Sequence, residues 1–217
     1  MDESRFPCSP QFACVGAQAD PYAAVPTLVL RLRVTDDAPG GVHAIALRCQ
    51  IRIEPARRHY TSGETDLLGD LFGPVTRWHD TVRAMQLATL SVTVPSFTGS
   101  IEVDVPVPCG YDLEVAAGKY FASLEDGEIP LLLLFSGTVF CRSERGFEVT
   151  PVPWDREARY RLPVALWREV MDLYFPDTGW LRLRRDTLRG LLRYKSARAL
   201  ATWDETVERL LEEAGDR

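Results

Sequence analysis

The most apolar stretch of the chain, "IPLLLLFSGTVF" at residues 129–140, most constrains how the chain can fold. Charged residues bracket this stretch, and a proline, a serine and a glycine lie inside it. A membrane-spanning helix needs about 20 consecutive apolar residues, which is longer than this run. Short apolar runs are typical of strands that are buried on both faces. The sequence therefore predicts a central buried strand and no membrane span.

Three residues of this stretch predict local features of the strand. Pro130 has no backbone N–H, so we expect it at the first residue of the strand. Ser136 and Gly137 lie midway, where a glycine marks a bulge or the close approach of another backbone. We therefore expect an irregularity in the middle of this strand.

Period-two alternation identifies the other strands. In "HAIALRCQIRI", residues 43–53, apolar side chains alternate with polar ones, as in a half-buried antiparallel strand. Further strands are expected at residues 27–34, 90–94, 101–107, 111–116 and 147–152. About seven strands at this spacing predict an antiparallel β-sandwich-like domain.

The remaining segments complete an α+β chain of three parts. Residues 1–24 are rich in proline and alanine, and we interpret them as an N-terminal arm in which "FACVGA" could form a short leading strand. Residues 25–153 form the β-sandwich-like domain, with a glycine-cut insertion of short helices at residues 56–83. From residue 154 to residue 217 the apolar period becomes 3.6, which predicts a three-helix segment packed on the sheet.

Charge and cysteine usage limit the classes of function. The net charge of −6 argues against general nucleic-acid binding. The cysteine count of five is odd, and the N-terminus has no basic segment followed by an apolar one. Both features argue against a secreted disulfide framework. We therefore expect a cytoplasmic protein with reduced thiols.

The cysteines give one candidate metal site. Cys8 and Cys14 could bind a metal ion or an iron–sulfur cluster, but their spacing matches no strong zinc motif. Two unrelated thiols are the alternative. Cys49 and Cys141 are expected in the core. Cys109 precedes a glycine, so we expect it to be the most accessible thiol and a weak candidate nucleophile.

No residue pattern names a reaction. The sequence contains no nucleophile-elbow, phosphate-loop or dinucleotide-binding motif, so we assign no catalytic residue and expect no cofactor. His59 or His79 could serve as a general base if a cleft brought it to a carboxylate or a thiol. Glu102 and Asp104 share a strand face, and we expect them to pair with arginines of the strand at residues 43–53 rather than to form a catalytic pair.

Two surfaces are candidates for binding a partner protein. In the insertion, Phe72 and Trp78 could anchor an interface, or they could fill an open end of the sandwich. In the C-terminal segment, four arginines at spacings of 3, 4 and 4 fall on one helix face: Arg182, Arg185, Arg189 and Arg193. This face could bind an acidic partner or a phosphate. The alternative is a solvated face that pairs with the acidic last helix.

Six phrases resemble an uncharacterised family of actinobacterial proteins of about this length: "HAIALRCQIRIEPARRHY", "DLFGPVTRW", "VPSFTG", "VPCGYDLEVAAGKYF", "IPLLLLFSGTVF" and "VPWD". The resemblance extends from about Pro26 to the last helix. It implies genes that neighbour uptake [NiFe]-hydrogenase operons, and a partner that is a hydrogenase subunit or maturation factor. It implies no catalytic or ligand residue.

The sequence thus favours a non-enzymatic accessory or protein-interaction protein. The resemblance implies a role in the assembly or attachment of a [NiFe]-hydrogenase or a similar redox metalloenzyme. Two alternatives remain open. One is a metal or iron–sulfur cluster carrier that uses Cys8, Cys14 and Cys109. The other is a hydrolase on an unfamiliar scaffold.

Overall fold

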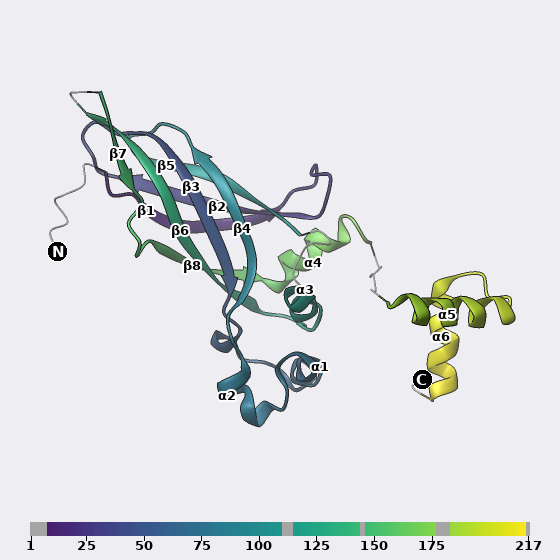
Figure 1. The fold of residues 1–217 in the computed structure, drawn as a ribbon. Helices are drawn as coiled ribbons and strands as arrows, with labels where there is room; N and C mark the ends of the chain where they lie inside the picture. The colour runs from purple at the N-terminus through teal and green to yellow at the C-terminus, as the bar shows by residue number, and fades with distance from the viewer. Residues whose placement is uncertain (1–7, 110–114, 144–145, 177–182, 216–217) are drawn as a thin grey trace. The chain divides into compact units, whose positions relative to one another are not determined.

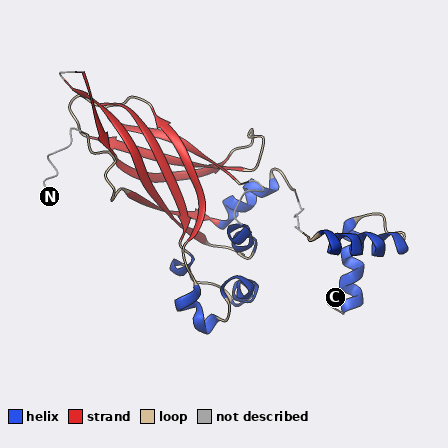
Figure 2. Ribbon diagram, viewed as in Figure 1, coloured by secondary structure: helices blue, strands red, loops and turns tan. Residues whose placement is uncertain are grey.

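The computed structural model describes residues 8–109, 115–143, 146–176 and 183–215 (Figure 1). The chain divides into two compact units, Met1–Pro176 and Asp177–Arg217. The first unit contains two antiparallel sheets and four α-helices, and the second contains two further helices (Figure 2). The expected α+β class with antiparallel sheets is therefore confirmed.

The first sheet has the strand order β1-β2-β5, with bounds Gln11–Ala19, Thr27–Asp36 and Gly99–Pro108. The inner face of β2 consists of buried aliphatic side chains. On its outer face, Arg31 lies across from Asp104 and Arg33 lies across from Glu102. Both pairs form ion pairs, at 3.1 and 2.7 Å. The two carboxylates therefore pair with arginines of β2, and not with those of residues 43–53 as we expected.

The second sheet contains β3 (Val42–Ile53), β4 (Met85–Val94), β6 (Glu128–Ser143), β7 (Gly146–Pro151) and β8 (Glu157–Pro163). β6 pairs with β3 along one side. Along its other side, β6 pairs first with β8 and then with β7. The predicted central buried strand is thus confirmed. It begins at Glu128, so Pro130 is not its first residue.

Gly137 lies where β6 changes its outer partner. The N–H of Phe135 donates to Arg156 in the segment before β8, and the carbonyl of Gly137 accepts from Val152 after β7. Gly137 has a φ of +142°, and a Cβ atom at this position would lie 2.1 Å from the carbonyl oxygen of Ala46. This contact is the close backbone approach that the sequence predicts.

Short helices cover one end of the first unit. The insertion between β3 and β4 contains two 3-10 turns, Pro55–Arg57 and Val75–Arg77, and the helices α1 (Ser62–Phe72) and α2 (Trp78–Thr81). Helices α3 (Val115–Ala122) and α4 (Val164–Asp172) contribute buried side chains to the one core cluster that both sheets share. The second unit consists of α5 (Arg185–Ala197) and α6 (Trp203–Ala214). Among the described residues, no helix combines the length and the apolar character that a membrane span requires.

Three segments differ from the sequence prediction. β1 lies within the expected arm and is longer than the short leading strand that "FACVGA" suggested there. β8 lies within the segment predicted to be helical, because a short period-two pattern with buried Ala158 and Leu162 precedes the helix. Of the strand predicted at residues 111–116, the last two residues begin α3 and the others lie outside the described residues.

Replacement of Gly137 tests the close approach of β6 to β3. We expect Gly137→Ala to lower the free energy of unfolding by about 2–4 kcal/mol, because the new methyl group meets the Ala46 carbonyl at a positive φ. Urea denaturation measures the change. Gly146→Ala is the matched control, because Gly146 also has a positive φ but no atom lies within 4 Å of the position that its methyl group would take. Equal losses in the two variants would contradict the steric argument.

Candidate functional site

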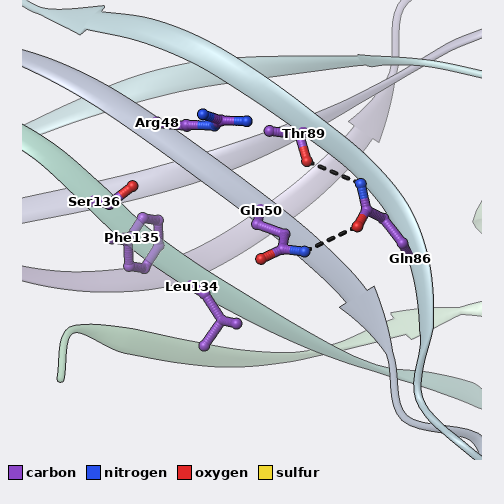
Figure 3. Close-up of a pocket in the computed structure, with 7 residues that line it drawn as sticks. All are labelled: Arg48, Gln50, Gln86, Thr89, Leu134, Phe135 and Ser136. Carbon is purple, nitrogen blue, oxygen red and sulfur yellow. Dashed lines mark hydrogen bonds between the residues drawn. The ribbon is translucent and has the colours of Figure 1, made fainter. Parts of the chain in front are cut away.

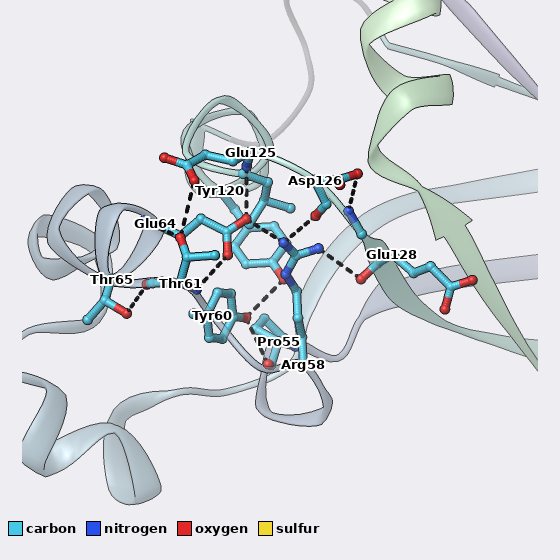
Figure 4. A network of polar contacts seen from close by, with 12 residues as sticks. Pro55, Arg58, Tyr60, Thr61, Glu64, Thr65, Tyr120, Glu125, Asp126 and Glu128 are labelled. Carbon is cyan, nitrogen blue, oxygen red and sulfur yellow. Dashed lines mark hydrogen bonds and ion pairs between the residues drawn. The ribbon is translucent and has the colours of Figure 1, made fainter.

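A buried ion pair holds the insertion in place (Figure 4). The side chains of Arg58 and Glu64 are 7% and 1% exposed, and they contact each other directly. The Glu64 carboxylate also accepts hydrogen bonds from the backbone N–H groups of Thr61 and Glu125, at 3.1 and 2.8 Å. The Arg58 guanidinium donates to the backbone carbonyls of Asp126 and Glu128. The pair therefore ties the start of α1 to the segment that leads into β6.

The local sequence explains how Glu64 reaches this position. Thr61 is the N-cap of α1, and its hydroxyl accepts from the Glu64 N–H while the Glu64 carboxylate accepts from the Thr61 N–H. This reciprocal capping box fixes the first turn of the helix. The Thr-x-x-Glu pattern is visible in the sequence, but the partner Arg58 lies outside the helix and the pattern does not predict it.

The electrostatics of the network keep Glu64 charged. Burial raises the pKa of this carboxyl, but the hydrogen bonds from Glu125, Thr61 and Arg58 outweigh burial and hold the pKa below its ordinary value. Tyr60 donates to the Pro55 carbonyl, so the Tyr120 hydroxyl donates to Tyr60 at 3.0 Å. Burial raises the pKa of both tyrosines, which keeps them neutral. The network thus has the character of a structural clamp.

The aromatic pair of the insertion lies beside this clamp. Phe72 is buried and Trp78 is half-buried, with ring centroids 5.5 Å apart in an edge-to-face arrangement. Trp78 also packs edge-on against Tyr60 and donates its indole N–H to the Gly73 carbonyl. Both side chains therefore contribute to the packing of the insertion, and a partner could reach Phe72 only if the insertion opened.

The basic face of α5 is exposed. Arg182 lies outside the described residues, while Arg185, Arg189 and Arg193 are exposed on α5 at intervals of four residues. Arg189 pairs at 3.7 Å with Asp186 of its own helix, and within the described residues the other two form no ion pair. Although α6 is acidic, the described ion pair between it and the end of α5 is formed by Arg198. Within the described residues, Arg185 and Arg193 therefore remain without an ion-pair partner.

The same unit exposes an apolar face. Among the described residues of this unit, no hydrophobic residue is buried. Five large apolar side chains are 40–46% exposed: Leu188, Leu192, Trp203, Val207 and Leu211. A unit of this size rarely buries enough apolar surface to be stable alone. Within the described residues, this unit therefore buries little apolar surface by itself.

A polar hollow lies on the outer face of the second sheet (Figure 3). Its volume is about 390 Å³. Residues of β3, β4 and β6 line it: Arg48, Gln50, Gln86, Thr89, Leu134, Phe135 and Ser136. The sequence places Arg48 and Gln50 on the polar face of their strand, but it does not predict which residues of β4 and β6 lie beside them.

Cys49 and Cys141 are buried in the core, as we expected, while the expectation that all thiols are reduced is contradicted. Cys8 forms a disulfide with Cys141, and the Cys14 thiol donates to the Gly16 carbonyl. Cys109 is buried, so the expectation of an accessible thiol there is wrong. Burial raises the pKa of Cys14 and of Cys109 to about 11, which keeps both thiols protonated at neutral pH. Within the described residues, no three potential ligands lie close enough to hold a metal ion.

The histidines lie on the surface of the first unit. His79 contacts Asp80, its neighbour in sequence, at 3.1 Å, and both side chains are exposed. His43 packs against the ring of Phe147, and His59 is exposed. The lining of the hollow includes none of these three residues. The described structure therefore does not place a histidine in the cleft that the hydrolase alternative requires.

Comparisons with known proteins identify a family but no activity. Residues 8–217 match the model of a family of unknown function (DUF6084). No curated protein matches the chain significantly.

Solved structures give only weak similarity. A protein of the late embryogenesis abundant (LEA) class aligns over 71% of this chain and 72% of its own, with 15% identity and a TM-score of 0.31. β-Glucosidase 3B from Thermotoga neapolitana gives 12% identity over 71% of this chain and 17% of its own, with a TM-score of 0.26. An ApaA protein from Bordetella pertussis gives 11% identity over 72% of this chain and 94% of its own, with a TM-score of 0.24. At these TM-scores the similarities support no functional argument.

The clamp predicts a specific pH dependence of stability. We expect Glu64→Gln to lower the free energy of unfolding by about 3 kcal/mol at neutral pH, because Arg58 is left buried without a counterion. The folded state lowers the pKa of Glu64, so its stabilisation is complete above the ordinary value of about 4.3 and is lost as the pH falls through the folded value. The difference in the free energy of unfolding between wild type and variant should therefore become smaller at acidic pH.

Denaturant titrations at neutral pH and near pH 3 measure this gap. Glu148→Gln is the control, because Glu148 is exposed on β7. We expect this control to change stability by less than about 0.5 kcal/mol. A gap between wild type and Glu64→Gln that stays constant with pH would contradict the assignment of the clamp.

Two tryptophans test whether the insertion aromatics serve packing or partner binding. We expect Trp78→Ala to lower the free energy of unfolding by about 2–3 kcal/mol, because it removes half-buried ring contacts and a hydrogen bond. Trp154 is 90% exposed, so Trp154→Ala should change the free energy of unfolding by less than about 0.5 kcal/mol. Thermal and urea unfolding measure both. Equal stability of the two variants would show that Trp78 is free for a partner.

Proposed function

This chain belongs to the family of unknown function DUF6084, and we propose that it is a non-enzymatic interaction protein that binds a partner through α5. The observation that supports this proposal is the combination of unpaired arginines and exposed leucines on one short helix. The first unit would act as a scaffold. We propose a β-sandwich-like arrangement for its two sheets, which the core that they share supports.

The residue order on α5 is regular. Leu188 follows Arg185 by three positions and immediately precedes Arg189. Leu192 stands in the same relation to Arg189 and Arg193. Residues three and four apart are neighbours on a helix surface, so arginines lie along an apolar stripe. This arrangement matches a partner helix that presents an apolar stripe edged by carboxylates.

Both parts of the surface contribute to such a complex. Burial of the leucine stripe would provide the hydrophobic contribution that the isolated unit lacks. The arginines would attract an acidic partner and fix its orientation, because complementary charges raise association rates and exclude other partners. We propose that the partner is an amphipathic acidic helix of another protein.

The resemblance described above suggests which protein carries this helix. A subunit or a maturation factor of an uptake [NiFe]-hydrogenase is the proposed partner, and assembly or attachment of that enzyme is the proposed process. A stable complex of this kind needs no reaction from the DUF6084 chain itself. Recognition of an acidic helix is therefore sufficient for the function that we propose.

A charge reversal on α5 tests the proposal. Arg193→Glu removes no ion pair within the described residues, so the variant should keep its fold. We expect copurification of the hydrogenase subunit or maturation factor from the native host to fall by about tenfold or more. Quantitative mass spectrometry of tagged wild type and variant measures the change. The control Arg83→Glu reverses an exposed arginine of the first unit and should retain the partner.

Three results would count against the proposal. Wild-type recovery of the partner by Arg193→Glu would remove α5 as the binding surface. An equal loss in Arg83→Glu would show a general charge effect. Light scattering that shows dimers of the wild type and monomers of Arg193→Glu would replace the proposed partner with a second copy of the chain. Circular dichroism of each variant verifies that the helices are intact.

A further inference from the structure

Arg48 of β3 differs from the arginines of β2 in the charges that lie beside it. On the first sheet, Arg31 and Arg33 of β2 each lie opposite a carboxylate of β5 and form an ion pair with it. On the second sheet, Arg48 of β3 lies in register between Ser91 of β4 and Ser136 of β6. Within the described residues, Arg48 has neither an ion pair nor a hydrogen bond to its side chain. Arg48 thus lacks the counterion that Arg31 and Arg33 have, whereas Arg159 and Arg161 of β8 in the same sheet form ion pairs.

Arg48 borders the hollow shown in Figure 3, which combines positive charge with polar side chains. The residues that line this hollow include no carboxylate. Further along β3, Arg52 lies on the same face, with Gln86 and Leu132 beside it in register. Arg48 is the charged residue of the lining, so the hollow carries a local positive charge although the chain as a whole is acidic.

Hydrogen bonds inside the hollow leave donors directed to a ligand. The Gln50 amide donates to Gln86 Oε1 at 2.9 Å, and the Gln86 amide donates to Thr89 Oγ1 at 3.0 Å. Because the Thr89 oxygen accepts in this chain, its hydroxyl proton remains for another acceptor. The second amide proton of Gln50 and the hydroxyl of Ser136 are further donors. The hollow is therefore rich in donors beside a guanidinium group.

We propose that this hollow binds a small hydroxylated molecule that carries an oxyanion, either a phosphate or a carboxylate. The planar guanidinium of Arg48 can bind two oxygens of such a group at once. The amides and hydroxyls of Gln50, Thr89 and Ser136 would bind the hydroxylated part. The volume of about 390 Å³ is within the range of small-molecule sites. This site lies on the sheet of the first unit and is independent of the α5 surface.

Three matched probes test the chemistry: glycerol 3-phosphate, glycerate and glycerol. They share a hydroxylated carbon body and differ in the presence and type of the anionic group. Backbone amide resonances of the full chain report where each probe binds. We expect saturable shifts for the two anions at β3, β4 and β6, and no such shifts for glycerol. The relative affinities of the two anions then distinguish phosphate from carboxylate.

Two variants separate the site from general attraction of anions to arginine. Arg48→Gln removes the exposed cation and should weaken binding of both anions by about tenfold or more. Arg33→Gln changes an arginine on the outer face of the first sheet and should leave the affinity unchanged. Thermal unfolding verifies that both variants remain folded.

The outcomes decide between a ligand site and a solvated arginine face. Saturable shifts at the hollow that Arg48→Gln removes and Arg33→Gln retains would establish the site. Shifts that are absent, that glycerol reproduces, or that survive in Arg48→Gln would overturn it. A result in which Arg33→Gln weakens binding as much as Arg48→Gln would also overturn it, because the anions would then bind the chain without preference.

Discussion

The pairing of β6 with three other strands is the constraint on which the first unit depends. This strand pairs with β3 along one edge, and it divides its other edge between β8 and β7. Gly137 makes this division possible, because the backbone there lies too close to Ala46 for any side chain. The apolar composition of β6 follows from the same position, since a strand paired on both edges at the centre of a sheet is buried.

The clamp and the binding surfaces illustrate two uses of arginine. Arg58 is enclosed, and its charge is balanced by Glu64 and by backbone carbonyls, so it serves the packing of the insertion. Arg48 and the arginines of α5 are exposed and lack a described counterion on a neighbouring element. An enclosed cation must have partners in the folded chain, because an isolated buried charge costs several kcal/mol. An exposed cation can remain without a partner in the folded chain at little cost in stability, because water solvates it.

Much of the fold could be predicted from the sequence, because period two and period 3.6 report directly on buried faces. β2, β3, β5, β6 and the capped α6 illustrate this. The prediction was weakest where the pattern was short. β8 is brief and rich in arginine and was not predicted, and β1, which contains mostly small residues, was expected only as a possible short strand within an arm. The candidate sites were harder to predict, because register determines them. The periodicity of apolar residues does not show that Glu102 lies opposite Arg33, or that Ser136 and Ser91 flank Arg48.

The charge balance of the chain gives these unpaired arginines their meaning. Acidic residues outnumber basic ones by 31 to 25, so many carboxylates are available to form ion pairs with surface arginines. On the first sheet, cross-strand pairing meets this expectation in two successive rows. On the second sheet the corresponding neighbours are serines and an amide, and on α5 the nearest charges leave Arg185 and Arg193 unpaired within the described residues. These are the positions at which we propose that another molecule supplies the counterion.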